Sequence, residues 1–166
     1  MFMAVLFSGC TTITNENSLE QVADFYVHAS FKTESDETVS IIVDHYQNGK
    51  RQNDTLLDLS SGELEKGNIH LSMIQLPDEE EMLIIGSINT DGSVVSNKSM
   101  LHMPSTTFSS IHSDAKLKSG EETMLGAIFF DEQSVSLEMI DIDELDDFIE
   151  AYEKIEHTYI VRAQIK

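Results

Sequence analysis

The sequence predicts a mainly β protein: an antiparallel β-sandwich of about eight or nine strands, with one amphipathic helix near the C-terminus and a last strand after it. From residue 25 onward apolar and polar side chains alternate, which is the period of a half-buried strand. Short turn sequences separate these segments without a strand-helix-strand rhythm, which favours antiparallel pairing. A compact barrel stays open as the alternative, because spacing along the sequence does not separate it from a sandwich.

The first two strands are expected at 25–32 and 39–46, on either side of the acidic turn Glu34-Ser35-Asp36-Glu37. Apolar residues occupy every second position of each segment, and the two segments are predicted to pair as a hairpin. Asn48-Gly49 then supplies the positive-φ residues of a tight turn, and a third strand is expected to begin within 55–59.

Three further strands are predicted in the middle of the chain, and more follow toward its C-terminal end. The middle segments are 69–73, 82–88 and 94–103. Residues 105–119 are rich in Ser and Thr and are predicted to be a long surface connection. The segment 123–130 is apolar on both faces, as in a central strand, and 135–139 alternates again.

The period changes to that of a helix only near the C-terminus. Asp141 and Glu144 form a capping-box pattern, which predicts that a helix begins there. The apolar residues that follow have 3.6-residue spacing and predict a stripe that packs on the sheet. These residues are Leu145, Phe148, Ile149, Tyr152 and Ile155. Alternation over 159–165 predicts the last strand.

Length and charge set limits on organisation and partners. A chain of 166 residues is long enough for one domain with a full core, which we expect over residues 21–166. The single cysteine excludes an internal disulfide. With 30 acidic and 10 basic residues the formal net charge is −20, which repels phosphates, so no nucleic acid partner is expected. The same charge favours solubility, cationic partners or metal ions.

The first ten residues form an apolar run that ends in Leu6-Phe7-Ser8-Gly9-Cys10. The run Phe2 to Phe7 is too short to span a bilayer, which takes roughly 20 apolar residues. The pattern resembles the lipobox of bacterial lipoproteins, in which small residues precede a cysteine that receives diacylglycerol. A buried strand with Cys10 as a core residue is the alternative.

The resemblance to small uncharacterised lipoproteins of Gram-positive bacteria implies a location and an anchor. Residues 1–9 would be the remaining part of a signal peptide that starts upstream, and 10–20 a lipidated cysteine and polar tether. The domain would then be extracytoplasmic and lipid-anchored to the cell membrane through Cys10, since two acyl chains suffice for stable attachment.

Two groups of residues are candidate metal ligands. Asp141, Asp143 and Asp147 begin like a calcium loop, but the glycine expected at the sixth loop position is missing, which favours helix capping. Met100 and His102 would point the same way in a strand, and with His70 and Met73 on a neighbouring strand they could hold copper. Packing of methionine in the core is the alternative.

No catalytic pattern is present in the sequence, and neither an enzyme nor a cofactor is predicted. An enzyme would need a deep pocket in which a histidine such as His45 or His112 meets a carboxylate. The predicted function is that of a non-catalytic interaction or accessory domain at the cell surface, with an unknown protein as its partner. The alternative is an extracytoplasmic binder of a small ligand or a metal cation, calcium or copper.

Overall fold

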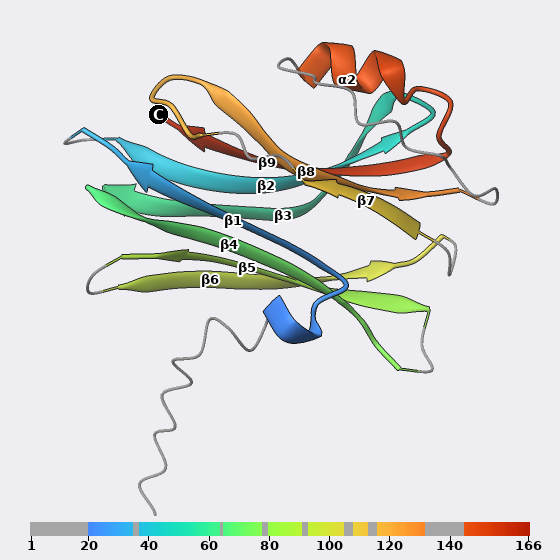
Figure 1. Ribbon diagram of the computed structural model, residues 1–166, viewed down its shortest axis with the longest axis horizontal. Coiled ribbons are helices and arrows are strands. Elements are labelled where there is room, and N and C mark those ends of the chain that lie inside the picture. Colours follow the sequence, from blue (N-terminus) through green and yellow to red (C-terminus); the bar gives the residue numbers. More distant parts are fainter. Residues whose placement is uncertain are drawn as a thin grey trace, which may run out of the picture.

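The computed structural model describes residues 20–34, 37–63, 65–77, 80–90, 93–104, 108–112, 116–131 and 145–166 (Figure 1). The elements are β1 (Phe25–Lys32), β2 (Thr38–Gln47), β3 (Lys50–Glu63), β4 (Lys66–Gln75), β5 (Glu81–Asn89), β6 (Val94–His102), β7 (Phe108–His112), β8 (Glu122–Phe130), α2 (Leu145–Ala151) and β9 (His157–Ile165). Within these ranges, no helix has the length and apolar character that crossing a membrane requires.

The strands form two antiparallel sheets that pack on each other as a sandwich. Sheet A has the order β1-β4-β5-β6, and sheet B has the order β3-β2-β9-β8-β7. Each sheet ends in two edge strands, so the sheets do not close into a barrel and the predicted sandwich is confirmed. Strand β3 also contacts β5 and β6, and β1 contacts β8, which brings the borders of the two sheets together.

The predicted hairpin between the first two strands is wrong, because the chain changes sheets between them. Strand β1 pairs with β4 over its whole length, whereas β2 pairs with β3 and β9. The backbone N–H of Thr33 donates to the carbonyl of Glu65, just before β4 of sheet A, and that of Thr38 donates to the carbonyl of Lys166, just after β9 of sheet B. The acidic turn is therefore a crossover between layers.

The long surface connection predicted at 105–119 is interrupted by strand β7, which is a second correction. Phe108 to His112 pair with Phe130 to Gly126 of β8, and β7 forms an edge of sheet B. Strand β3 is also longer than predicted, since it runs from Lys50 to Glu63. The strand predicted at 135–139 lies outside the described residues.

The main core lies between the sheets and follows the predicted alternation. In β1, Phe25, Val27, Ala29 and Phe31 are buried while the residues between them are more exposed. Their partners come from both sheets and include some of the most buried side chains of the protein. Among these are Ile41, Leu57, Ile69, Leu71, Met73, Met82, Ile84 and Ile88. Burial of these apolar surfaces is the main force that holds the sheets together.

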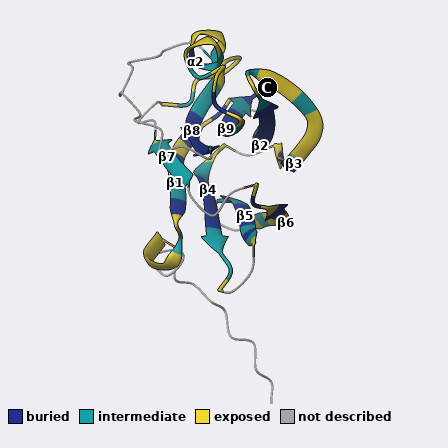
Figure 2. Ribbon diagram, turned by 90° about the vertical axis from the view of Figure 1, so that its right-hand side faces the viewer, coloured by how far each residue is buried: buried dark blue, intermediate teal, exposed yellow. Residues whose placement is uncertain are grey.

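A second, smaller core lies between α2 and the outer face of sheet B, as the predicted apolar stripe requires. Phe148 and Ile155 pack there with Tyr46, Phe129 and Ile160. Figure 2 shows α2 on the side of sheet B that faces away from sheet A, with most of the helix surface exposed. The predicted cap at Asp141 and Glu144 lies outside the described residues, which begin again at Leu145 at the start of α2.

The turn between β2 and β3 has the predicted positive-φ residues. Asn48 has φ of 48° and Gly49 has φ of 72°. A Cβ atom on Gly49 would lie 2.8 Å from the Cβ of Glu153, because the chain after α2 passes directly over the turn. Glycine is therefore required at position 49 both by the backbone conformation and by this contact.

Candidate functional site

Two histidines from distant parts of the sequence meet on the inner face of sheet B. His45 lies on β2 and His157 is the first residue of β9, where the pairing of the two strands places Gln47 opposite His157 and His45 opposite Tyr159. The Nε2 atom of His45 lies 2.9 Å from the Nδ1 atom of His157. The aromatic ring of Tyr159 stacks on His45 with 4.6 Å between centroids.

A carboxylate lies at the outer nitrogen of each of these histidines. The Nδ1 atom of His45 is 3.1 Å from Oδ2 of Asp54, and the Nε2 atom of His157 is 3.8 Å from Oε1 of Glu156. Asp54 and Glu156 are more than half exposed, whereas the two imidazoles are mostly buried. We call these four residues the histidine cluster; its carboxylates connect the two buried rings to the surface.

The surroundings of the cluster disfavour the charged forms of His157 and Tyr159. Burial, and next the charge of His45, lower the pKa of His157 below its ordinary value, although Glu156 and Asp54 act in the opposite direction. Burial raises the pKa of the Tyr159 phenol above its usual range, with a contribution from Asp54. A neutral imidazole retains one nitrogen lone pair, which can accept a proton or bind a metal ion.

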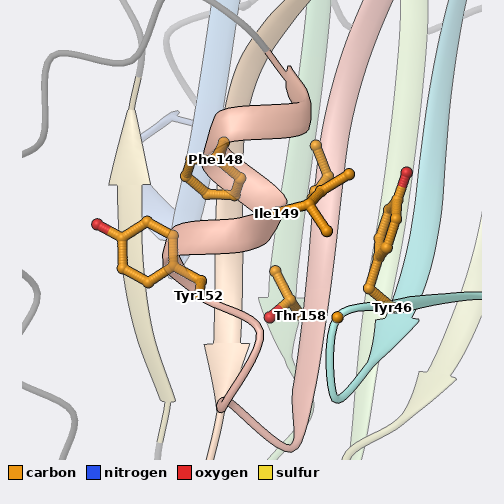
Figure 3. Close-up of a pocket in the computed structure, with 7 residues that line it drawn as sticks. Tyr46, Phe148, Ile149, Tyr152 and Thr158 are labelled. Atoms are coloured by element: carbon orange, nitrogen blue, oxygen red, sulfur yellow. The ribbon is translucent and has the colours of Figure 1, made fainter.

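A small apolar pocket lies on the opposite face of sheet B, beneath α2 (Figure 3). Its lining residues are Tyr46, Gly49, Phe148, Ile149, Tyr152, Thr158 and Ile160. The enclosed volume is about 10 Å³, which is about the space of one water molecule and far below the roughly 300–1,000 Å³ of drug-sized ligand sites. This pocket is a packing gap of the second core and does not fit a ligand.

A buried group of charged residues lies on the same outer face of sheet B, beside the second core. Asp44 on β2 is only 1% exposed and accepts hydrogen bonds from Arg51 at 2.7 Å and from Arg162 at 2.5 Å. Arg162 also pairs with Glu122 on β8. The hydrogen bond to Asp44 raises the pKa of Arg51. These contacts connect four strands of sheet B, β2, β3, β8 and β9, and give the group a structural role.

The outer face of sheet A differs in charge from the rest of this acidic protein. By the alternation of side chains along β1, β4, β5 and β6, this face carries three lysines, three histidines and one carboxylate, in a chain with 30 acidic and 10 basic residues. These residues are Lys32, Lys66, Lys98, His28, His70, His102 and Glu81. We call this surface the basic face.

Hydrogen bonds and ring stacking order the centre of the basic face. His28 and His70 are direct partners of β1 and β4, and their rings stack with 4.7 Å between centroids. The hydroxyl of Tyr26 lies 2.7 Å from Nδ1 of His70. Among the described residues, α2 covers sheet B only, and at the other end of the sandwich the ribbon shows just the short helical segment at residues 20–22, before β1 (Figure 2).

The structure does not bring the predicted copper ligands together. Met100 and His102 do lie on the same face of β6, and Met100 is 43% exposed. Met73 is fully buried in the main core, on the opposite side of β4 from His70. The strand register places Met100 beside Leu83 and places His70 beside Ser87, four residues further along β5.

The predicted calcium ligands are only partly visible. Asp147 lies exposed in the first turn of α2, whereas Asp141 and Asp143 lie outside the described residues, as does Cys10. In the part of the chain that the structure describes, no group of three or more His, Cys, Asp or Glu side chains is placed to hold a metal ion. A metal site built from the described residues would therefore have at most two such side chains as ligands.

One contact named above as a mark of an enzyme, that of a histidine with a carboxylate, is present. His45 does meet a carboxylate, that of Asp54, but the pocket of Figure 3 lies on the other face of sheet B. His112 stacks on Phe25 with 4.9 Å between ring centroids. The contact between His45 and His157 had no signal in the sequence, because 112 positions separate them and only the pairing of β2 with β9 joins them.

Comparison with known proteins identifies the family of the chain. A family model described as the YgaN domain matches residues 11–165. No curated protein and no solved structure matches the chain. Because the family match spans almost the whole sequence, including both sheets and α2, the chain belongs to the YgaN domain family.

Proposed function

We propose that this protein is a non-catalytic interaction domain, held outside the cytoplasm by a lipid on Cys10, and that it binds an acidic protein through the basic face. The observation that carries the proposal is the distribution of charge. In a chain with net charge −20, the strands of this one broad sheet surface carry three lysines and one carboxylate, with Glu80 beside His102 at the border. Complementary charge steers association and excludes wrong partners.

The composition of the basic face also suits protein contact. Met100 offers apolar area beside Lys98 on β6 and is one of the few large apolar side chains of the described residues that are exposed. Tyr26 adds an aromatic ring on β1, at the other edge of the same face. Tyrosine, methionine and a polar rim are typical of the core and border of protein interfaces. The other outer face of the sandwich is covered by α2 and carries acidic side chains such as Asp146 and Asp147.

The proposed anchor follows from the lipobox-like sequence that ends at Cys10, about 15 residues before β1 begins at Phe25. The tether would therefore enter the domain at β1, an edge strand of sheet A. This arrangement would keep the domain close to the membrane while leaving it free to reorient toward a neighbouring protein.

Replacing Cys10 with alanine tests the anchor. The native protein, expressed in its own cells from the upstream start, is expected in the membrane fraction, and Cys10→Ala is expected to move it to the soluble fraction, because the diacyl group is lost. Intact mass of the native protein should correspond to a chain that begins at diacylated Cys10. Immunoblots of the membrane and soluble fractions measure how the protein is distributed between them.

Thr11→Ala is the matched control, since it changes the next residue of the tether and leaves the cysteine in place. The control should stay in the membrane fraction. Unchanged membrane retention of Cys10→Ala would contradict the proposed anchor.

A further inference from the structure

We propose that His45 and His157 form a binding site for a divalent late transition-metal ion, with Cu²⁺ as the best fit. The site is independent of the basic face, since both histidines lie on the inner face of sheet B. Imidazole nitrogen is a preferred ligand of copper, nickel and zinc, whereas calcium requires oxygen ligands. Water would complete the coordination of the metal ion.

The distance between the two facing nitrogens matches the spacing of adjacent ligands. Nε2 of His45 and Nδ1 of His157 are 2.9 Å apart. Two nitrogens bound at about 2.0 Å and at a right angle to each other lie roughly 2.8 Å apart, which is the tetragonal geometry that Cu²⁺ prefers. The ring planes are inclined by 21° with 5.2 Å between centroids, so the facing nitrogens point at each other across their hydrogen bond. Binding a metal ion therefore requires both rings to turn until their lone pairs meet at one point.

The outer nitrogen of His45 is oriented as in known metal sites, and a carboxylate lies 3.8 Å from that of His157. A metal-bound histidine usually donates its other N–H to a carboxylate, which fixes the ring and makes the bound nitrogen more basic. Asp54 occupies that position for His45, and Glu156 lies on the corresponding side of His157. Both carboxylates are exposed and negatively charged, so they also attract a cation to the entrance of the site.

Metal binding requires the hydrogen bond between the two histidines to open. Metals bind neutral imidazole. When the pair is neutral and the Nδ1–H of His45 faces Asp54, the proton between the facing nitrogens resides on Nδ1 of His157. Metal binding shifts that proton to Nε2, beside Glu156, and no net proton is released.

The pair of His28, which is exposed, and His70, which is mostly buried, is the main competitor for the metal. His28 and His70 also stack across neighbouring strands, but Nδ1 of His70 is in contact with a phenol, that of Tyr26. His102 lies 4.0 Å from Glu80 and is a single ligand. Because their surroundings differ, the experiment can tell binding at His45 and His157 from binding at His28 and His70 or at His102.

The test is to titrate purified full-length chain, free of tags, with CuCl₂ and to follow the imidazole signals of all six histidines by NMR. Substoichiometric Cu²⁺ should broaden the signals of His45 and His157 first, and the EPR spectrum should show coupling to two imidazole nitrogens. His157→Gln should abolish binding at equimolar copper. Asp54→Asn, which changes only the orienting carboxylate, should weaken binding by about 10–100-fold.

His102→Gln is the control, because it removes an exposed histidine of the other sheet, and its affinity should equal that of the native chain. Broadening that begins at His28, His70 or His102 would overturn the proposal, as would native affinity in His157→Gln or no binding by the native chain. If His157→Gln does not fold, the NMR and EPR results on the native chain still decide the question.

Discussion

Replacing Asp44 with alanine is expected to lower the free energy of unfolding by about 3 kcal/mol or more, the range for breaking a buried ion pair. Asp44 is 1% exposed and accepts hydrogen bonds from Arg51 and Arg162. Its removal leaves the mostly buried Arg162 with Glu122 as its remaining charged partner. Urea unfolding followed by circular dichroism measures the change.

An exposed ion pair of the same protein provides the control for Asp44→Ala. Lys118 and Glu121 form an exposed pair three residues apart. Lys118→Ala should therefore cost less than about 1 kcal/mol. A loss in Asp44→Ala no larger than that of the control would show that the buried group does not hold β2, β3 and β9 together.

Phe148→Ala is expected to have an effect of similar size, about 3–5 kcal/mol, because it removes a large side chain from a packed core. Phe148 is 1% exposed and contacts the rings of Phe129 and Tyr152. Since α2 is only seven residues long, it depends on this packing for its position. The amide protons of α2 should exchange faster in the variant than in the native protein.

Glu150→Ala is the matched control, since Glu150 lies on the exposed side of the same helix. Its stability should stay within about 0.5 kcal/mol of the native value. If Phe148→Ala left both stability and amide exchange unchanged, α2 would not be docked on sheet B as described.

The strands and the faces they bury could be predicted from the sequence, whereas the partners of the strands could not. Alternation over 25–32 located β1 and its buried face correctly. The turn at 34–37 looks the same whether the next strand pairs with β1 or joins the other sheet, so the hairpin prediction was wrong. Strand β7 was missed because Ser109 and Ser110 interrupt its short apolar pattern.

The contacts within the candidate sites could not be predicted from the sequence either, because their side chains are brought together by the pairing of strands that are far apart in the chain. Asp44 and Arg162 are 118 positions apart, and His45 and His157 are 112 apart. Neither contact leaves a local pattern. The spacing of Met100 and His102 correctly placed both on one face of β6, but it carried no information on which histidine or methionine lies beside them.

The basic face was hidden in the sequence for a related reason. Alternation identifies which residues of each strand point outward, but not which sheet is covered by α2. The lysines are spread over β1, β4 and β6, and only the order β1-β4-β5-β6 gathers them on one surface. Net charge, which is strongly negative, indicated the opposite kind of partner.

Site-specific photo-crosslinking in the native cells tests the central claim most directly. A photoreactive residue at position 96, on the outer face of β6, should give one discrete protein adduct, and Lys98→Glu should greatly reduce its yield. The same photoreactive residue at position 150, on the exposed side of α2, should not give this adduct. Equal adducts from both positions, adducts to lipid alone, or an unchanged yield with Lys98→Glu would contradict the claim that the basic face binds an acidic protein.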